Sequence, residues 1–164
     1  MSAMKSLQDL FVNLLKDVYY AEKQILKTLP KLAKKADSDE LRQAFEHHLK
    51  ETEGQVQRLE QVFALCDLKP SGKTCHAIKG ILEEGEEDIK DAKDPDVLDA
   101  GMIADAQAVE HYEIARYGTM IAWAKQLGRK DAASLLEETL EQEYNADRTL
   151  TELAEGSLNR QAAA

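Results

Sequence analysis

The sequence predicts an all-α protein, a four-helix bundle with an extra short helix in the connection between its two helical hairpins. Four long segments repeat apolar residues at intervals of three and four, which is the period of an amphipathic helix. Residues typical of helix starts and stops separate these segments. The 164 residues include only 8 Gly and 3 Pro, and 32% are charged, which favours long solvated helices over a β-sandwich or a disordered chain.

The first hairpin is predicted over residues 6–35 and 40–65. Ser6, followed by Asp9, is typical of a capped helix start. Asp37 or Ser38 offers the same chemistry before the second helix. Because few residues separate the two helices, we expect them to be antiparallel neighbours.

The second hairpin is predicted over residues 95–127 and 130–155. The dipeptide Asp94-Pro95 is a strong start signal, and Gly128 and Gly156 are stop signals. Between the hairpins, residues 74–93 predict a shorter, acidic helix. A connection of this length is the one that ferritin-like bundles use. We therefore expect one ferritin-like domain over residues 1–158 and a frayed tail over residues 159–164.

The composition argues against several function classes. A net charge of −10 disfavours binding to nucleic acid or to anionic membranes. No apolar run approaches the roughly 18 residues of a membrane span, and no signal-peptide pattern is present. Cys66 and Cys75 lack zinc-ligand spacing and fit a reduced, cytoplasmic protein better than a disulfide scaffold.

Acidic residues lie on the predicted apolar faces of all four long helices, where a carboxylate is costly unless something positive meets it. The interval between the acidic positions is 29 residues in the first hairpin and 33 in the second, so both sets are expected at one level of the bundle. These residues are Glu22, Glu51, Glu110, Glu113 and Glu143.

A layer of carboxylates in a four-helix bundle predicts a pair of metal ions, iron or manganese, with two ions per chain. The usual pattern supplies a His three residues after each bridging Glu, but Gly54 and Ala146 stand at those positions. The candidates to replace the missing imidazoles are Glu113, together with Asp147 or with His48, which lies three residues before Glu51. The site is therefore expected to be rich in carboxylates and either to bind hard cations, to bind its metal weakly or to be vestigial.

A structural interpretation stands beside the metal site. Arg58, Arg116 and Arg148 lie near the acids in sequence and could form an ion network with them. His48 taken alone is more often a core histidine than a ligand. The tyrosines close to the layer either donate hydrogen bonds or simply pack, and packing is favoured; they are Tyr19, Tyr20, Tyr112, Tyr117 and Tyr144.

Four stretches of the chain resemble the YciF/YciE family of bacterial stress-related proteins, and the likeness extends from Leu7 to about Ala154. The most specific is Val109-Glu-His-Tyr-Glu-Ile-Ala-Arg-Tyr-Gly118. The others are Tyr20-Ala-Glu-Lys-Gln24, His48-Leu-Lys-Glu-Thr52 with Gly54-Gln55, and Ala124-Lys-Gln-Leu-Gly128.

The resemblance implies a rubrerythrin- and ferritin-like fold, a bacterial cytosolic protein, a homodimer and a two-metal site at the five glutamates. Some relatives carry His where this chain has Glu53, so by this resemblance too the site has fewer imidazole ligands than usual. Two functions remain open: a di-metal oxidase or peroxide scavenger, and a non-enzymatic stress or assembly module whose acidic layer is an ion network. A ferritin-style storage cage is a lesser third, and whether the protein is an enzyme is left undecided.

Overall fold

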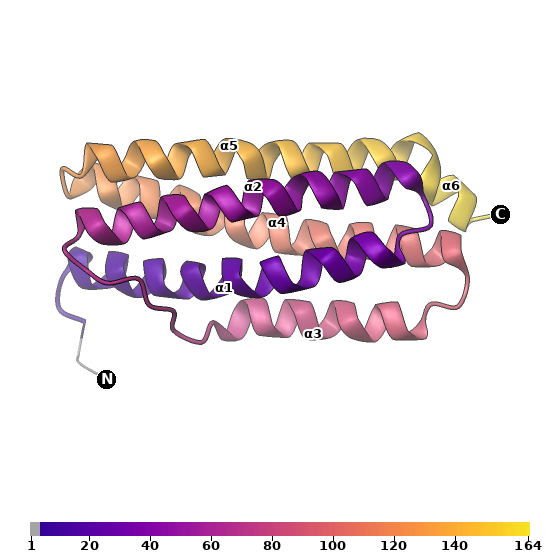
Figure 1. Ribbon diagram of the computed structural model, residues 1–164, viewed down its shortest axis with the longest axis horizontal. Helices are drawn as coiled ribbons and strands as arrows, with labels where there is room; N and C mark the ends of the chain where they lie inside the picture. The colour runs from indigo at the N-terminus through magenta and orange to yellow at the C-terminus, as the bar shows by residue number, and fades with distance from the viewer. Residues whose placement is uncertain (1–3) are drawn as a thin grey trace.

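The computed structural model describes residues 4–164, and its regular elements are all helical. In chain order they are α1 (Leu7–Lys35), α2 (Asp39–Leu65), α3 (His76–Asp91), α4 (Pro95–Gln126), α5 (Lys130–Leu153), the π-helical turn η1 (Ala154–Leu158) and α6 (Asn159–Ala162). Four of these, α1, α2, α4 and α5, are long and lie along one axis, with α3 beside them (Figure 1). The predicted all-α fold class is confirmed.

The order and direction of the helices are those of a ferritin-like bundle. In each hairpin, α1 with α2 and α4 with α5, the second helix runs back along the first (Figure 1). Helices α2 and α4 run in the same direction, so the chain must return along the bundle between them, and α3 makes that return. This long crossover distinguishes the ferritin-like arrangement from a simple up-and-down bundle.

Most of the predicted helix caps are present. Ser6 Oγ accepts the Asp9 N–H at 3.1 Å, and Ser38 Oγ accepts the Leu41 N–H at 3.3 Å. Asp94 caps α4 by accepting the N–H groups of Asp96 and Val97, with Pro95 at the first helical position. Each cap satisfies N–H groups that have no partner within the helix.

Gly128 ends α4 in a left-handed conformation, with φ of 71°. The Gly128 N–H bonds the Lys125 carbonyl at 3.1 Å, and the Arg129 N–H bonds the Ala124 carbonyl at 2.9 Å. This pair of bonds is the Schellman motif. Asp67 ends α2 in the same way with φ of 56°, although Asp is a less common residue there than Gly and was not predicted as the stop.

The predicted end of the last helix at Gly156 was wrong. Gly156 lies inside η1, and α6 continues over Asn159–Ala162, where the sequence predicted a frayed tail. Ala154 and Leu158 on either side of Gly156 are buried, and α6 packs against α4. Burial of these apolar side chains stabilises the helical path more than one glycine weakens it.

The interior is divided into two apolar clusters by a polar layer. On α1, Val18 belongs to one cluster and Ile25 to the other, with Glu22 between them. On α4, Val109 and Tyr117 belong to different clusters. The buried polar residues of the layer are Glu22, His48, Thr52, Gln55, Glu110, Glu113, Thr139 and Glu143. The acidic positions therefore meet at one level, as the paired intervals predicted.

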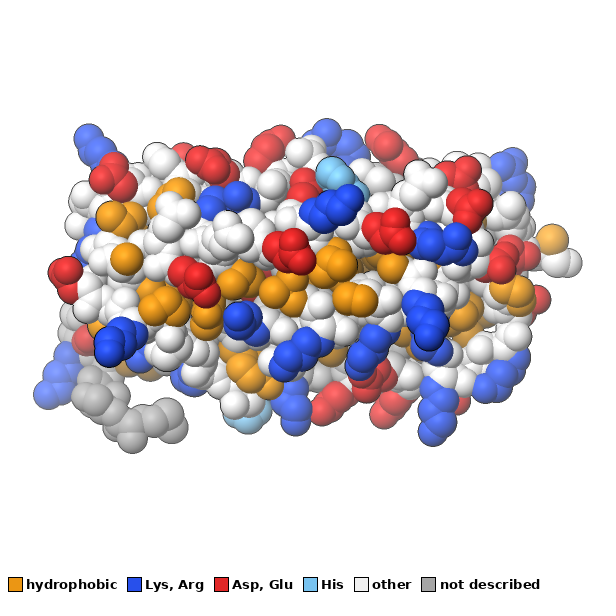
Figure 2. Space-filling model, viewed as in Figure 1, with side chains coloured by type: hydrophobic (Ala, Val, Ile, Leu, Met, Phe, Trp, Pro, Cys, Tyr) orange, Lys and Arg blue, Asp and Glu red, His pale blue; other side chains and the backbone are white. Residues whose placement is uncertain are grey.

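On the face shown in Figure 2, charged side chains of both signs flank a band of hydrophobic side chains that follows the long axis. Among residues 4–164, no helix is both long enough and apolar enough to cross a membrane.

Asp99 joins the two hairpins at the turn between α1 and α2. Its side chain, 1% exposed on α4, accepts the Asp37 N–H at 2.9 Å and the Ser38 N–H at 2.7 Å. Arg42 donates to the Ala36 carbonyl at 3.0 Å in the same turn. A carboxylate from the second hairpin thus satisfies backbone groups in the first.

Replacing Asp99 with Ala should lower the free energy of unfolding by about 2–4 kcal/mol, because two backbone N–H groups lose an ionised acceptor. Urea unfolding followed by circular dichroism measures this change. Asp96→Ala, a partly buried position in the first turn of the same helix, is the control and should cost only about 0.5 kcal/mol. Equal losses in the two variants would contradict the joining role of Asp99.

Candidate metal centre

Each long helix contributes to the acidic layer through its inward face. Helix α1 supplies Glu22, and α5 supplies Glu143. Helix α4 supplies Glu110 and Glu113, and α2 supplies His48 and Glu51; members of each pair are three residues apart and so share one helix face. Glu22, Glu113 and Glu143 are fully buried, and Glu110 and His48 are nearly so.

Four of these residues form a compact set of ligand-type groups. His48, Glu110, Glu113 and Glu143 each offer one ligand atom, and these atoms all lie within 4.8 Å of one another. His48 Nε2 lies 3.1 Å from Glu110 Oε1 and 3.7 Å from Glu143 Oε2. The other ring nitrogen, Nδ1, lies 3.4 Å from Glu51 Oε2. The imidazole of His48 thus lies between the buried carboxylates of Glu110 and Glu143 and the partly exposed carboxylate of Glu51.

Most carboxylate oxygens in the layer have no hydrogen-bond partner among residues 4–164. They are Glu22 Oε2, Glu110 Oε2, both oxygens of Glu113 and both oxygens of Glu143. Tyr117 donates its hydroxyl to Glu22 Oε1. Within residues 4–164, no Lys or Arg nitrogen lies within 4.0 Å of these glutamates, so His48 is the basic side chain that faces them.

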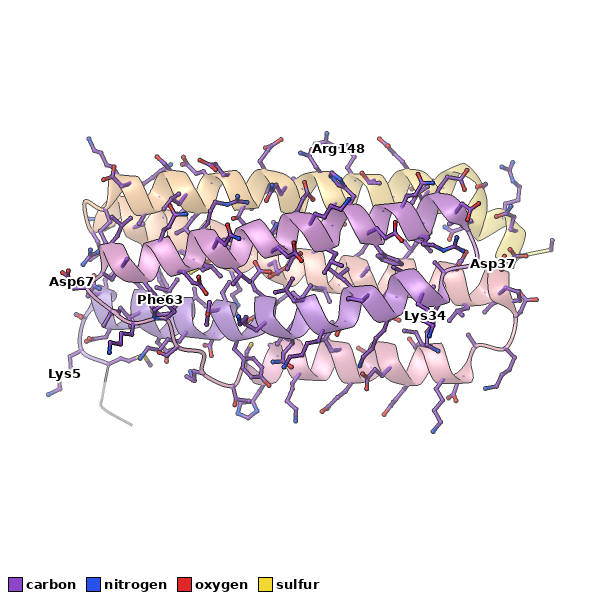
Figure 3. All side chains as sticks on the ribbon, in the orientation of Figure 1. Lys5, Lys34, Asp37, Phe63, Asp67 and Arg148 are labelled. Atoms are coloured by element: carbon purple, nitrogen blue, oxygen red, sulfur yellow. The ribbon has the colours of Figure 1, made fainter. Side chains whose placement is uncertain are left out.

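The arginines of the predicted ion network lie elsewhere. Arg58 donates to Thr139 Oγ1 at 3.0 Å and to Gln142. Arg116 lies over the Tyr112 ring, 5.2 Å from its centroid. Arg148 lies on the outer side of α5 in Figure 3. These contacts leave the layer without the cations that an ion network requires.

Burial and mutual repulsion make the layer bind protons strongly. Burial raises the pKa of Glu22 to about 7, although Tyr117 and His48 act to lower it. Burial and the neighbouring glutamates raise the pKa values of Glu113 and Glu143 well above 4.5.

The His48–Glu110 pair holds its charge. Burial acts to lower the pKa of His48, but Glu110 and the other acids outweigh it and raise the pKa well above 6.5. Burial likewise acts to raise the pKa of Glu110, but His48 outweighs it and lowers that pKa.

The other predicted residues have different surroundings. Glu51 lies at the edge of the layer with a side chain 19% exposed, and its Oε1 is 3.3 Å from His47 Nε2. Asp147 does not join the compact set; it faces His111 Nε2 at 3.2 Å and accepts from Gln107 at 3.0 Å. The His111 ring is 68% exposed.

The hydroxyl of Tyr117 has the hydrogen-bonding role that was the less favoured alternative for the tyrosines. Tyr117 was predicted to pack, and it does pack in the apolar core, but its hydroxyl also bonds Glu22. The signal was present, because Tyr117 falls four residues after Glu113 on one helix face. Gln55 was not among the predicted site residues, yet it is fully buried in the layer, and within residues 4–164 its Oε1 has no partner.

This donor set fits a metal ion. Clustered carboxylate oxygens and an imidazole are donors that bind divalent metal ions in proteins. The unpartnered oxygens of Glu113 and Glu143 provide the negative charge that such an ion would neutralise. The buried cluster can therefore hold a metal.

Four long helices with a crossover connection, packed around a buried carboxylate and histidine cluster, define a ferritin-like helical bundle. Residues 6–163 match the family described as "Domain of unknown function (DUF892)", and the chain belongs to this family. Protein YciF of Escherichia coli (strain K12) is 47% identical over 160 residues, which cover 97% of this chain and 96% of that protein. The stress-protein family suggested by the sequence motifs is thus confirmed.

Solved structures agree with this assignment. The crystal structure of the E. coli stress protein YciF matches with a TM-score of 0.90 and covers 95% of this chain and 99% of that one. YcfI from Rhodopseudomonas palustris matches with a TM-score of 0.88 at 47% identity and covers 90% and 94% of the two chains. A Xanthomonas campestris protein, 24% identical with a TM-score of 0.71 over 92% of each chain, shares the fold.

In the presence of a chelator, stability should fall as the pH rises from 5 to 8. Glu22, Glu113 and Glu143 retain protons in the folded state that the unfolded chain releases near pH 4.5, so their contribution is present below that pH and is lost as the pH rises through their raised pKa values. The raised pKa of His48 acts in the same direction. The lowered pKa of Glu110 acts oppositely, but only below pH 4.5.

For Glu22 alone, a pKa of about 7 corresponds to on the order of 3 kcal/mol lost across this range. Urea unfolding at a series of pH values in EDTA measures the effect. Glu22→Gln should flatten the profile, while Glu138→Gln on the exposed face of α5 should leave it unchanged. A wild-type protein that gains stability from pH 5 to 8 would contradict the protonated layer.

Proposed function

We propose that this chain is a ferritin-like stress protein whose buried layer holds two iron or manganese ions and handles oxygen or peroxide. His48, Glu110, Glu113 and Glu143 form the compact ligand set, and Glu22 and Glu51 on either side would complete the second ion's ligands. A metal pair in such a site supplies binding and reduction of oxygen or peroxide.

The observation that carries the proposal is the set of buried carboxylate oxygens without partners. A buried carboxylate that has lost its water shell costs several kcal/mol unless a cation or proton compensates it, as transfer energies indicate. The single imidazole of His48 cannot neutralise Glu22, Glu110, Glu113 and Glu143 together. Bound cations would supply the remaining charge.

The surrounding residues suit a metal centre. Glu51 faces Nδ1 of His48, which leaves Nε2 directed at Glu110 and Glu143. Tyr117 fixes one oxygen of Glu22 and leaves the other free. Outer contacts of this kind orient ligands and tune their basicity. The apolar clusters on both sides of the layer exclude water from the bundle axis.

Apoprotein loaded anaerobically with Fe²⁺ or Mn²⁺ should retain about two ions per chain after gel filtration, the stoichiometry of ferritin-like carboxylate sites. Elemental analysis measures the retained metal, and peroxide consumption by the loaded protein measures activity. The double variant Glu113→Ala with Glu143→Ala should retain less than one ion. Wild-type protein that also retains less than one ion per chain would rule out the proposal.

The alternative is that the acidic layer is a structural ion network. The two functions predict opposite changes in the free energy of unfolding when one acid is removed. In EDTA at pH 8, Glu143→Gln should raise the free energy of unfolding by about 1–3 kcal/mol, because Gln removes a buried group that must either take up a proton or hold a charge repelled by Glu110. In an ion network the same change would strand a buried cation and destabilise the protein. Thermal unfolding decides between them, with Glu138→Gln as the exposed control on the same helix.

A further inference from the structure

A cavity of about 80 Å³ opens between α2 and α5 and extends to the acidic layer. Its lining includes exposed His47 on α2 and, deeper, the buried His48 and Glu110. A cavity needs only about 10–15 Å³ of such volume to hold one water molecule. The volume of this cavity therefore leaves room for a metal ion that keeps part of its water shell.

Ligand-type atoms follow one another along this cavity. The His47 side chain is 74% exposed, and its Nε2 lies 3.3 Å from Glu51 Oε1. Glu51 Oε2 lies 3.4 Å from His48 Nδ1, and His48 Nε2 lies 3.1 Å from Glu110 Oε1. Glu110 Oε2 is buried and has no partner. The chain of donors thus begins in solvent and ends at an unsatisfied carboxylate.

Small side chains keep the opening clear. Ala44 on α2 and Ala146 on α5 both line the cavity, each only partly buried. A Leu at either position would place three more carbon atoms in the space between the helices. His48 offsets the charge of Glu110 in the lining, and Glu51 leaves the lining with a net negative charge that attracts cations and repels anions.

We propose that this cavity is the route by which divalent cations reach the buried layer, with His47 as a transient ligand at its mouth and Glu51 as the first ligand of the layer behind it. The inference rests on the proposed metal-binding function and adds to it an assigned entrance and a role for His47. Glu51 accepts the cation from His47 and passes it to His48 and Glu110, and His48 releases its proton to solvent as the cation binds. The ion exchanges one ligand for the next along the cavity, with no change of oxidation state.

The test follows Mn²⁺ uptake by full-length apoprotein in stopped-flow experiments, with a fluorescent chelator reporting free Mn²⁺. Ala146→Leu should slow association at least tenfold and slow dissociation by the same factor, so that Kd stays within about threefold, because a narrowed route changes rates rather than the site. His47→Ala should slow association several-fold with an unchanged Kd.

Two matched controls should load at the wild-type rate. Ala64→Leu adds the same bulk to α2 at an exposed position away from the cavity. His111→Ala removes another exposed histidine that faces an acid, Asp147, outside this cavity.

The outcomes separate the route from the function. If wild-type protein binds no Mn²⁺, the proposed metal function itself fails. If it binds Mn²⁺ but Ala146→Leu and His47→Ala both load at the wild-type rate, the route is overturned and the metal site stands. If Ala146→Leu does not fold, Ala44→Leu and the surface change His47→Ala decide the question alone. A weakened Kd with unchanged association would also overturn the route.

Discussion

The concentration of negative charge inside the bundle is the constraint on which the rest of this structure depends. Glu22, Glu110, Glu113 and Glu143 are held away from water beside one imidazole. In a low-dielectric interior such charges repel strongly unless protons or cations compensate them. The helices must therefore be stabilised elsewhere, and the apolar clusters above and below the layer provide that stabilisation.

The buried carboxylates make the bundle less stable than an apolar core at the same positions would. A core of Leu and Ile at these positions would pack without any cost of desolvation. In natural proteins, buried polar groups that lack hydrogen-bond partners occur mainly at functional sites. Arginines that could have neutralised the layer instead bond Thr139 and Gln142 or lie over Tyr112. The layer therefore remains available for ions that arrive from solution.

The helices and their order follow from local signals, which is why the sequence predicts them well. Ser6, Ser38 and Asp94 act on backbone groups within one turn, and the apolar period is set by the helix itself. The level of the acidic layer follows from helix length. The hydrogen-bond partners of a side chain do not follow from helix length. Arg58 and Asp147 each bond a residue on another helix, and the direction of the side chain decides which one. The helical path through Gly156 likewise depends on tertiary burial of Leu158.

The contact of Asp99 with the α1–α2 turn has a consequence for the order of folding. During synthesis, the first hairpin leaves the ribosome before Asp99, which follows Asp37 and Ser38 by about sixty residues. Until α4 docks, the N–H groups of that turn have only water as a partner. The first hairpin is thus incomplete as an autonomous unit, and the acidic layer is assembled only when both halves of the chain are present.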